Sequence, residues 1–100
     1  MTFAYTVRAE FQDLSLRAEY LAWLRDGHAA AVVAGGAQRA EVLDVSDGAV
    51  EARYWFAAEA DFQAYLAGPA EALRADGASR FPLGATILLT RSTGTVVGTA

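Results

Sequence analysis

Apolar and polar residues alternate at the start of the chain, which is the pattern of a β-strand with one buried face. Phe3, Tyr5 and Val7 fall on one face of this segment, and Thr6 and Arg8 fall on the other. The same alternation returns three times further along the chain. The expected strands are residues 2–10, 38–45, 49–56 and 85–91.

Between the first two strands, apolar residues recur at helical spacing. The stripe consists of Leu16, Tyr20, Leu21, Leu24, His28, Ala31 and Val32. Asp13 or Ser15 can cap the start of this helix, and Gly35-Gly36 can end it, because paired glycines supply the left-handed cap. Gly27 weakens the helix and is expected to kink it just before His28.

A second helix is predicted from Ala58, ending at Gly77, with a break or kink at Gly68-Pro69. Its apolar stripe consists of Phe62, Tyr65, Leu66, Ala70 and Leu73. Ser46-Asp47-Gly48 is a hairpin turn between the second and third strands, since Asp and Gly accept the positive φ such turns need. A loop over Ser79–Gly84 leads into the last strand.

The order strand, helix, strand, strand, helix, strand predicts an α+β fold, the ferredoxin-like βαββαβ sandwich. Such a fold has one four-stranded antiparallel sheet with two helices on one face. We expect residues 1–91 to form a single domain. The segment 92–100 is a C-terminal tail that either frays or adds Val96-Val97 to an edge strand of its own or a partner subunit.

The sheet face away from the helices mixes charged residues with large apolar ones. It is expected to carry Thr6, Arg8, Arg39, Glu41, Leu43, Val45, Glu51, Arg53, Trp55, Thr86 and Leu88. An exposed patch containing Trp55, Leu43 and Leu88 favours a homodimer in which two sheets pack face to face. In the alternative, cross-strand Arg–Glu pairs and long Arg stems shield Trp55 in a monomer.

Composition excludes several classes of partner. The 100 residues include 8 Arg, no Lys and 12 acidic residues, for a net charge of −4, so no basic surface for nucleic acid is expected. The absence of Cys removes disulfides and thiolate chemistry. No apolar run is long enough to span a membrane, and the start lacks the features of a signal peptide. The sequence therefore predicts a soluble, cytoplasmic protein without membrane partners.

Short motifs along nearly the whole chain, to about Arg91, resemble those of a small bacterial family of unknown function. They are Tyr5-x-Val7, Tyr20-x-x-Trp23-Leu24 followed by His28, Gly35-Gly36, Tyr54-x-Phe56, Ala60-Asp61-Phe62-x-x-Tyr65-Leu66, Ala72-Leu73-Arg74 and Arg80-Phe81. That family belongs with the dimeric α/β-barrel proteins, a wider group that includes antibiotic-biosynthesis monooxygenases, EthD-like proteins and stress-responsive barrel proteins. The resemblance implies ferredoxin-like subunits that dimerise through their sheets, and no established activity. Several members of the group place a small-molecule site between sheet and helices.

The single histidine, His28, is the candidate catalytic residue, as a general base, a haem ligand or a donor that orients a ligand. Its alternative role is that of a core histidine bonded to a backbone carbonyl near Gly27. Trp23 lies about 140° from His28 on an ideal helix, so the two share a pocket only if Gly27 bends the chain. No second His, no Cys and no carboxylate at i+3 or i+4 accompanies His28, so we expect no metal site and no bound cofactor.

The candidate ligand-binding residues are Tyr5, His28, Tyr54 and Arg80. Aromatic side chains with polar tips suit a pocket for a planar ligand, although packing in the core is the explanation expected for most of the aromatic residues. Arg80, just before Phe81-Pro82, can hold a carboxylate-bearing ligand at a pocket mouth, or it can be solvated or paired with a Glu.

Three hypotheses of function follow. The first is a homodimer that binds a small apolar or aromatic molecule between sheet and helices. The second is an enzyme that uses His28, either a cofactor-independent monooxygenase or isomerase, or a haem-modifying protein. The third is a structural or regulatory dimer without a ligand, in which His28 and the aromatic residues only pack.

Overall fold

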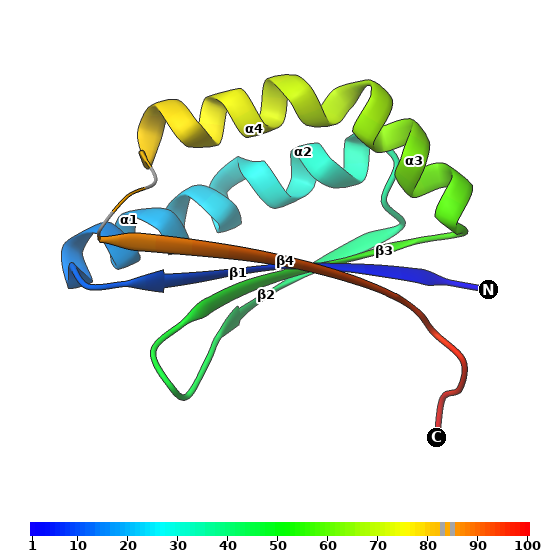
Figure 1. Cartoon of the computed structure of the whole chain (residues 1–100), viewed down its shortest axis with the longest axis horizontal. Coiled ribbons are helices and arrows are strands. Elements are labelled where there is room, and N and C mark those ends of the chain that lie inside the picture. Colours follow the sequence, from blue (N-terminus) through cyan, green and yellow to red (C-terminus); the bar gives the residue numbers. More distant parts are fainter. Residues whose placement is uncertain (83, 85) are drawn as a thin grey trace.

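The computed structural model, which describes residues 1–82, 84 and 86–100, is a four-stranded antiparallel sheet with two rows of helices on one face (Figure 1). The strands are β1 (Phe3–Phe11), β2 (Arg39–Asp44), β3 (Val50–Phe56) and β4 (Ile87–Thr95), in the spatial order β2-β3-β1-β4. One helical row comprises α1 (Leu14–Trp23), the π-helical turn η1 (Leu24–His28) and α2 (Ala29–Ala34), and the other comprises α3 (Glu59–Ala67) and α4 (Pro69–Arg80). The predicted ferredoxin-like α+β fold is confirmed.

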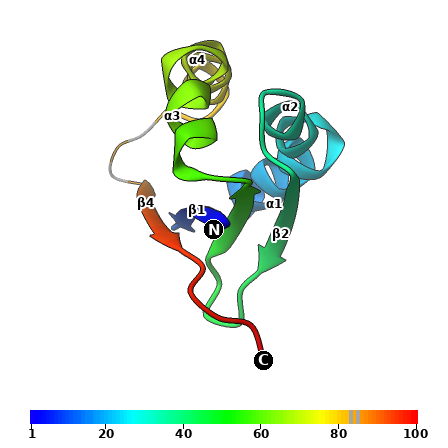
Figure 2. The same cartoon turned by 90° about the vertical axis from the view of Figure 1, so that its right-hand side faces the viewer.

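Both rows of helices lie on the same side of the sheet, as the end-on view shows (Figure 2). The core fills the space between the two layers. From the sheet come Phe3, Tyr5, Ala9, Val50, Ala52, Tyr54, Phe56 and Ile87, and from the helices come Tyr20, Leu24, Val32, Phe62, Tyr65 and Ala70. The apolar face predicted for each element is the one that is buried. No helix in the part of the chain that the structure describes is long and apolar enough to cross a membrane.

The predicted signals at the ends of the elements act as expected. The Asp13 Oδ1 atom accepts from the backbone N–H groups of Ser15 at 2.9 Å and Leu16 at 3.4 Å, which caps α1. Gly36, with φ of +135°, follows the end of α2, and Gly48, with φ of +95°, lies in the β2–β3 turn. Both glycines supply backbone angles that other residues rarely adopt.

The second helix breaks at Gly68, as predicted, but its end was predicted wrongly. Gly77 lies inside α4, which continues to Arg80. The glycine is needed for packing instead: a Cβ atom added at Gly77 would lie 3.0 Å from Cη2 of Trp23. The predicted loop over Ser79–Gly84 is therefore shorter at its start. Position 83 of that loop and position 85, the predicted start of the last strand, lie outside the described residues.

The last strand runs further than its hydrophobic alternation indicates. β4 pairs with β1 as far as Phe3↔Thr95, and the Val96 N–H donates to the Thr2 carbonyl at 2.8 Å. Residues 92–95 are small and polar, so they carry no buried pattern. Backbone hydrogen bonds to β1 hold these residues in the sheet, and the alternation of apolar and polar side chains does not indicate such bonds.

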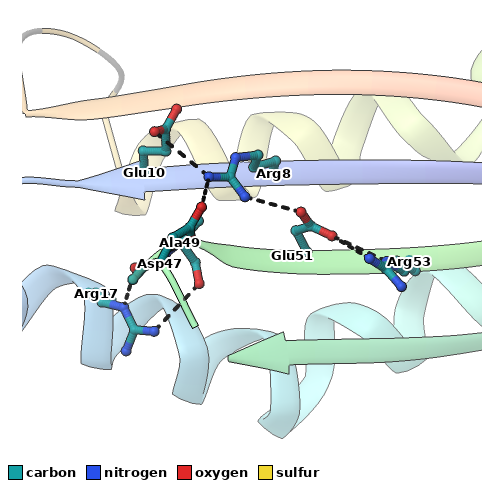
Figure 3. A network of polar contacts seen from close by, with 8 residues as sticks. Arg8, Glu10, Arg17, Asp47, Ala49, Glu51 and Arg53 are labelled. Atoms are coloured by element: carbon teal, nitrogen blue, oxygen red, sulfur yellow. Dashed lines mark hydrogen bonds and ion pairs between the residues drawn. The ribbon is translucent and has the colours of Figure 1, made fainter. Parts of the chain in front are cut away.

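The sheet face away from the helices, called here the outer face, carries a network of ion pairs (Figure 3). Arg8 pairs with Asp47 at 2.6 Å and with Glu51 at 3.2 Å, and Glu51 also pairs with Arg53 at 2.9 Å. The Arg39 guanidinium lies 4.0 Å from the ring centroid of Trp55. The Arg–Glu pairs and the Arg stem expected of a shielded outer face are thus present within one chain. Leu88 remains 60% exposed on this face.

Candidate functional site

A pocket lies between the sheet and both helical rows. It is lined by Tyr5, Val7, Tyr20, Trp23, Leu24, His28, Val32, Tyr54, Tyr65, Leu73, Arg74, Gly77, Ala78, Phe81, Leu89 and Arg91. Its volume is about 80 Å³. One buried water needs roughly 10–15 Å³ on this measure, so the pocket has room for several waters or one aromatic ring.

Trp23 and His28 share this pocket because the first helical row changes its geometry between them. In η1 the Ala29 N–H bonds to the Leu24 carbonyl, five residues back, instead of four. Gly27 leaves helical angles altogether, with φ of 178° and ψ of −37°. This wider turn brings the Trp23 and His28 rings together, with centroids 3.9 Å apart and planes 20° apart. The predicted irregularity at Gly27 is confirmed.

His28 is half-buried, and its surroundings favour the neutral imidazole. Burial lowers the pKa of His28 below its ordinary value, and the nearby Asp76 carboxylate acts weakly in the opposite direction. A neutral imidazole has one nitrogen that donates a hydrogen bond and one that accepts. Asp76 itself accepts a hydrogen bond at 3.3 Å from Nε1 of Trp23. The geometry thus provides a neutral base in a pocket, held against an indole ring.

Three buried tyrosines line the pocket without a hydrogen-bond partner for their hydroxyl groups among the described residues: Tyr20, Tyr54 and Tyr65. Their oxygens are not sealed in the core, since no fully buried side-chain oxygen or nitrogen in that part of the chain lacks a partner. Burial raises the pKa of each, that of Tyr20 to about 12. At neutral pH these side chains are therefore protonated phenols that can donate to a molecule in the pocket.

Tyr5 differs from the other three tyrosines because its hydroxyl oxygen accepts hydrogen bonds from two arginines. Nη2 of Arg74, on α4, donates at 3.3 Å, and Nε of Arg91, on β4, donates at 3.1 Å. The contacts connect the sheet to the second helical row at the pocket. Two positive charges therefore flank one side of an otherwise largely aromatic lining.

Of the predicted ligand-binding residues, the structure brings Tyr5, His28 and Tyr54 together around this pocket. Arg80 is not among the described residues that line it. Its Nε donates to Oδ1 of Asp76, one helical turn earlier, at 3.1 Å, and its side chain is 58% exposed. The alternative that Arg80 pairs with an acidic residue agrees with this geometry, with Asp76 in place of a Glu.

The sequence reasoning missed the two arginines that do line the pocket. Arg91 continues the inward series Ile87, Leu89 on β4, where it pairs with Val7 across the sheet. Extending that alternation by two positions would have found it. Arg74 directly follows Leu73, at the margin of the apolar stripe of α4.

No group of three or more His, Asp and Glu side chains gathers anywhere within the described residues in a way that could hold a metal ion. A porphyrin is far larger than a cavity of about 80 Å³. The geometry therefore favours a small ligand or a proton-accepting role for His28 over the haem hypothesis.

No protein-family model matches the chain, and no curated protein matches it in sequence. Solved structures share its fold over nearly their whole length. A dimeric ferredoxin-like protein from an uncultured marine organism has a TM-score of 0.73 at 16% identity, covering 99% of this chain and 98% of its own. Rv0793 from Mycobacterium tuberculosis has a TM-score of 0.72 at 14% identity, covering 100% and 99%.

A third similar structure is SnoaB from Streptomyces nogalater, described as a cofactor-independent oxygenase. Its TM-score is 0.65 at 20% identity, and the match covers 98% of this chain and 95% of SnoaB. At these identities the likeness establishes the fold. The chain thus has a ferredoxin-like fold, as the sequence resemblance implies, and a dimeric protein and a cofactor-independent oxygenase have similar structures.

Proposed function

We propose that this protein binds a small, largely aromatic molecule in the pocket between sheet and helices, and that it does so as a homodimer. The observation that supports the ligand is that the buried residues Tyr20, Tyr54 and Tyr65 line one cavity, where their accessible hydroxyls have no hydrogen-bond partner among the described residues. A buried tyrosine hydroxyl usually has a hydrogen-bond partner. A filled apolar core would leave neither the space nor the unpaired donors.

Thermal denaturation with single-ring probes tests the ligand proposal. Toluene, p-cresol and benzoate fit the volume of the pocket, and p-cresol and benzoate can also accept from the tyrosine hydroxyls. We expect at least one polar probe to raise the melting temperature in a concentration-dependent way, because a ligand that binds only the folded state stabilises it. A melting temperature unchanged by all three probes at millimolar concentration contradicts the proposal.

The homodimer proposal rests on the outer face. Leu88 is 60% exposed there, and Trp55 lies half-buried under Arg39 on the same face. A second copy packed sheet to sheet would cover both side chains, and the similar marine protein is described as dimeric. In such an assembly the pockets of the two subunits would lie on opposite sides of the paired sheets, because each pocket is on the helical face.

A second candidate function is cofactor-independent oxygenation or isomerisation, with His28 as the base. Its support is the neutral, pocket-lining imidazole stacked on Trp23, together with the fold shared with SnoaB. Incubation of hydroquinone, a single-ring probe, with the protein in air, followed by mass spectrometry, provides a test. Oxidised product that falls by a factor of about 10² or more in His28→Gln supports a base. Equal product from both proteins contradicts that role.

A further inference from the structure

The arginines of this protein fall into two groups. Arg8, Arg17, Arg39, Arg53 and Arg80 each form an ion pair with Asp or Glu. Within residues 1–82, 84 and 86–100, no carboxylate pairs with Arg25, Arg74 or Arg91. Of these three, Arg74 and Arg91 line the pocket. These two guanidinium groups therefore place two positive charges without a carboxylate partner at one site, in a protein with 12 acidic residues and a net charge of −4.

Arg74 and Arg91 both have N–H groups that make no hydrogen bond to a described residue. A guanidinium carries five N–H groups, and each of these two makes a single side-chain hydrogen bond to a described residue, the one to the Tyr5 hydroxyl. Tyr5 is a neutral acceptor, so it fixes the position of both cations without cancelling their charge. The Tyr5 hydroxyl oxygen thus holds two guanidinium groups beside each other, and each keeps N–H groups that can donate to a ligand. This geometry suits a carboxylate.

The charge of these arginines reaches the rest of the lining. Arg74 and Arg91 both act to lower the pKa of Tyr65, against the effect of burial, and Arg91 acts in the same way on Tyr20. Both tyrosines are buried residues of the pocket. The positive field is therefore felt inside the cavity as well as at the exposed ends of the two arginines.

We propose that Arg74 and Arg91, held by Tyr5, bind the carboxylate of the ligand, so that the pocket is selective for one-ring aromatic acids over neutral molecules of the same shape. This inference rests on the proposed ligand-binding function and specifies the chemistry of the ligand. The ring would lie among the aromatic side chains, with its carboxylate at the guanidinium groups. Arg80 belongs to a separate pair with Asp76 and takes no part.

The test measures the affinities of two matched pairs of probes, benzoate against benzamide and phenylacetate against phenylacetamide, by isothermal titration calorimetry at low salt. Each pair differs in charge and hardly in shape. We expect the wild-type protein to bind each acid at least tenfold more tightly than its amide. The preference is expected to shrink in 0.5 M salt, because Arg74 and Arg91 are partly exposed and their charges are screened.

Substitution assigns the preference to the arginines. The double variant Arg74→Gln/Arg91→Gln should bind acid and amide equally, whereas Arg80→Gln, on the same helix, should retain the wild-type preference. Loss of the preference in Arg80→Gln, or its survival in the double variant, overturns the assignment. Circular dichroism melts of each variant establish that it is folded.

The remaining outcomes separate this inference from the function on which it rests. Equal wild-type affinity for acid and amide overturns the carboxylate site and leaves the aromatic pocket in place. No binding of any probe, at a protein concentration where the melts show a folded chain, overturns both.

Discussion

The indole ring of Trp23 and the imidazole ring of His28 stack with their centroids 3.9 Å apart, although the two residues would face in different directions on a regular α-helix. The π-helical turn between them produces this contact. His28 is the only histidine in the sequence, and this contact places it against the fluorescent indole ring of Trp23. The protonation state of His28 can therefore be followed in the fluorescence of Trp23.

Stability should fall as the pH is lowered through the range just below 6.5. Burial lowers the folded-state pKa of His28, so between that value and the unfolded value of about 6.5 the unfolded chain binds a proton that the folded chain does not. The contribution is fully present above pH 6.5. Urea denaturation at intervals from pH 7.5 to 5 should show the decline, and His28→Gln should reduce it.

Three aspartates with lowered pKa values do not interfere with that measurement. Asp13, Asp47 and Asp76 have pKa values below the ordinary value, so their contributions to the free energy of unfolding persist until the pH falls below about 4.

The fluorescence of Trp23 should report the protonation of His28. In a Trp55→Phe background, Trp23 is the only tryptophan, and its emission should change with a midpoint below pH 6.5. A midpoint above 6.5 would show that His28 is stabilised as the cation.

Removing the Tyr54 hydroxyl should hardly change stability. Its oxygen has no partner among the described residues and is accessible from the pocket, so Tyr54→Phe breaks no hydrogen bond there. We expect a change in the free energy of unfolding of less than about 1 kcal/mol. Phe56→Ala, on the same strand and fully buried, should cost about 3–5 kcal/mol. A large loss in Tyr54→Phe would mean that the hydroxyl is bonded within the protein.

A larger side chain at Gly77 should displace Trp23 and fill part of the pocket. A Cβ atom there would lie 3.0 Å from the indole, so Gly77→Val is expected to cost about 1–3 kcal/mol and to weaken the binding of single-ring probes. Ala75→Val places the same β-branched residue at an exposed position of α4 and serves as the control. Equal effects of the two variants on probe binding would contradict the position given to Trp23.

A charge on the outer face should prevent dimerisation. Leu88→Asp places a carboxylate at the exposed apolar position of the sheet, and burying an unpaired charge is unfavourable. Native mass spectrometry and light scattering are expected to give a dimer for the wild type and a monomer for this variant. Leu14→Asp, at a 77% exposed position at the start of α1, should remain dimeric. A monomeric wild type contradicts the homodimer proposal.

Most of the fold follows from hydrophobic periodicity, because each strand and helix buries the face that its pattern indicates. The errors occur where another force decides. Gly77 lies inside α4, and a Cβ atom there would approach the indole of Trp23, a neighbour about which the pattern of a single helix carries no information. β4 extends beyond its apolar positions because β1 offers backbone groups with which to pair.

The pocket was harder to predict than the fold. Tyr5 and Tyr54 fall on inward strand positions, so their presence in the lining follows from alternation. The stacking of Trp23 on His28 depends on how the chain bends at Gly27, and the sequence indicates the bend without its direction. The place of Arg80 before Phe81 makes it the candidate that the sequence indicates, whereas Arg74 and Arg91 are the arginines that line the pocket. Hydrogen bonds to the Tyr5 hydroxyl hold Arg74 and Arg91 at the pocket, and they join residues that are distant in sequence.

The spatial order of the strands has a consequence for how this protein is made. Tyr5 and Arg91 are 86 positions apart along the chain, yet they form one hydrogen bond of the pocket wall. During synthesis, the β2–β3 hairpin and the first helices can form early. β1 can pair with β4 only when Ile87–Thr95 has left the ribosome. Pairing at such sequence separation is slow. The binding cavity should accordingly be the last part of the molecule to mature, and nascent chains should gain ligand affinity in a late, separate phase.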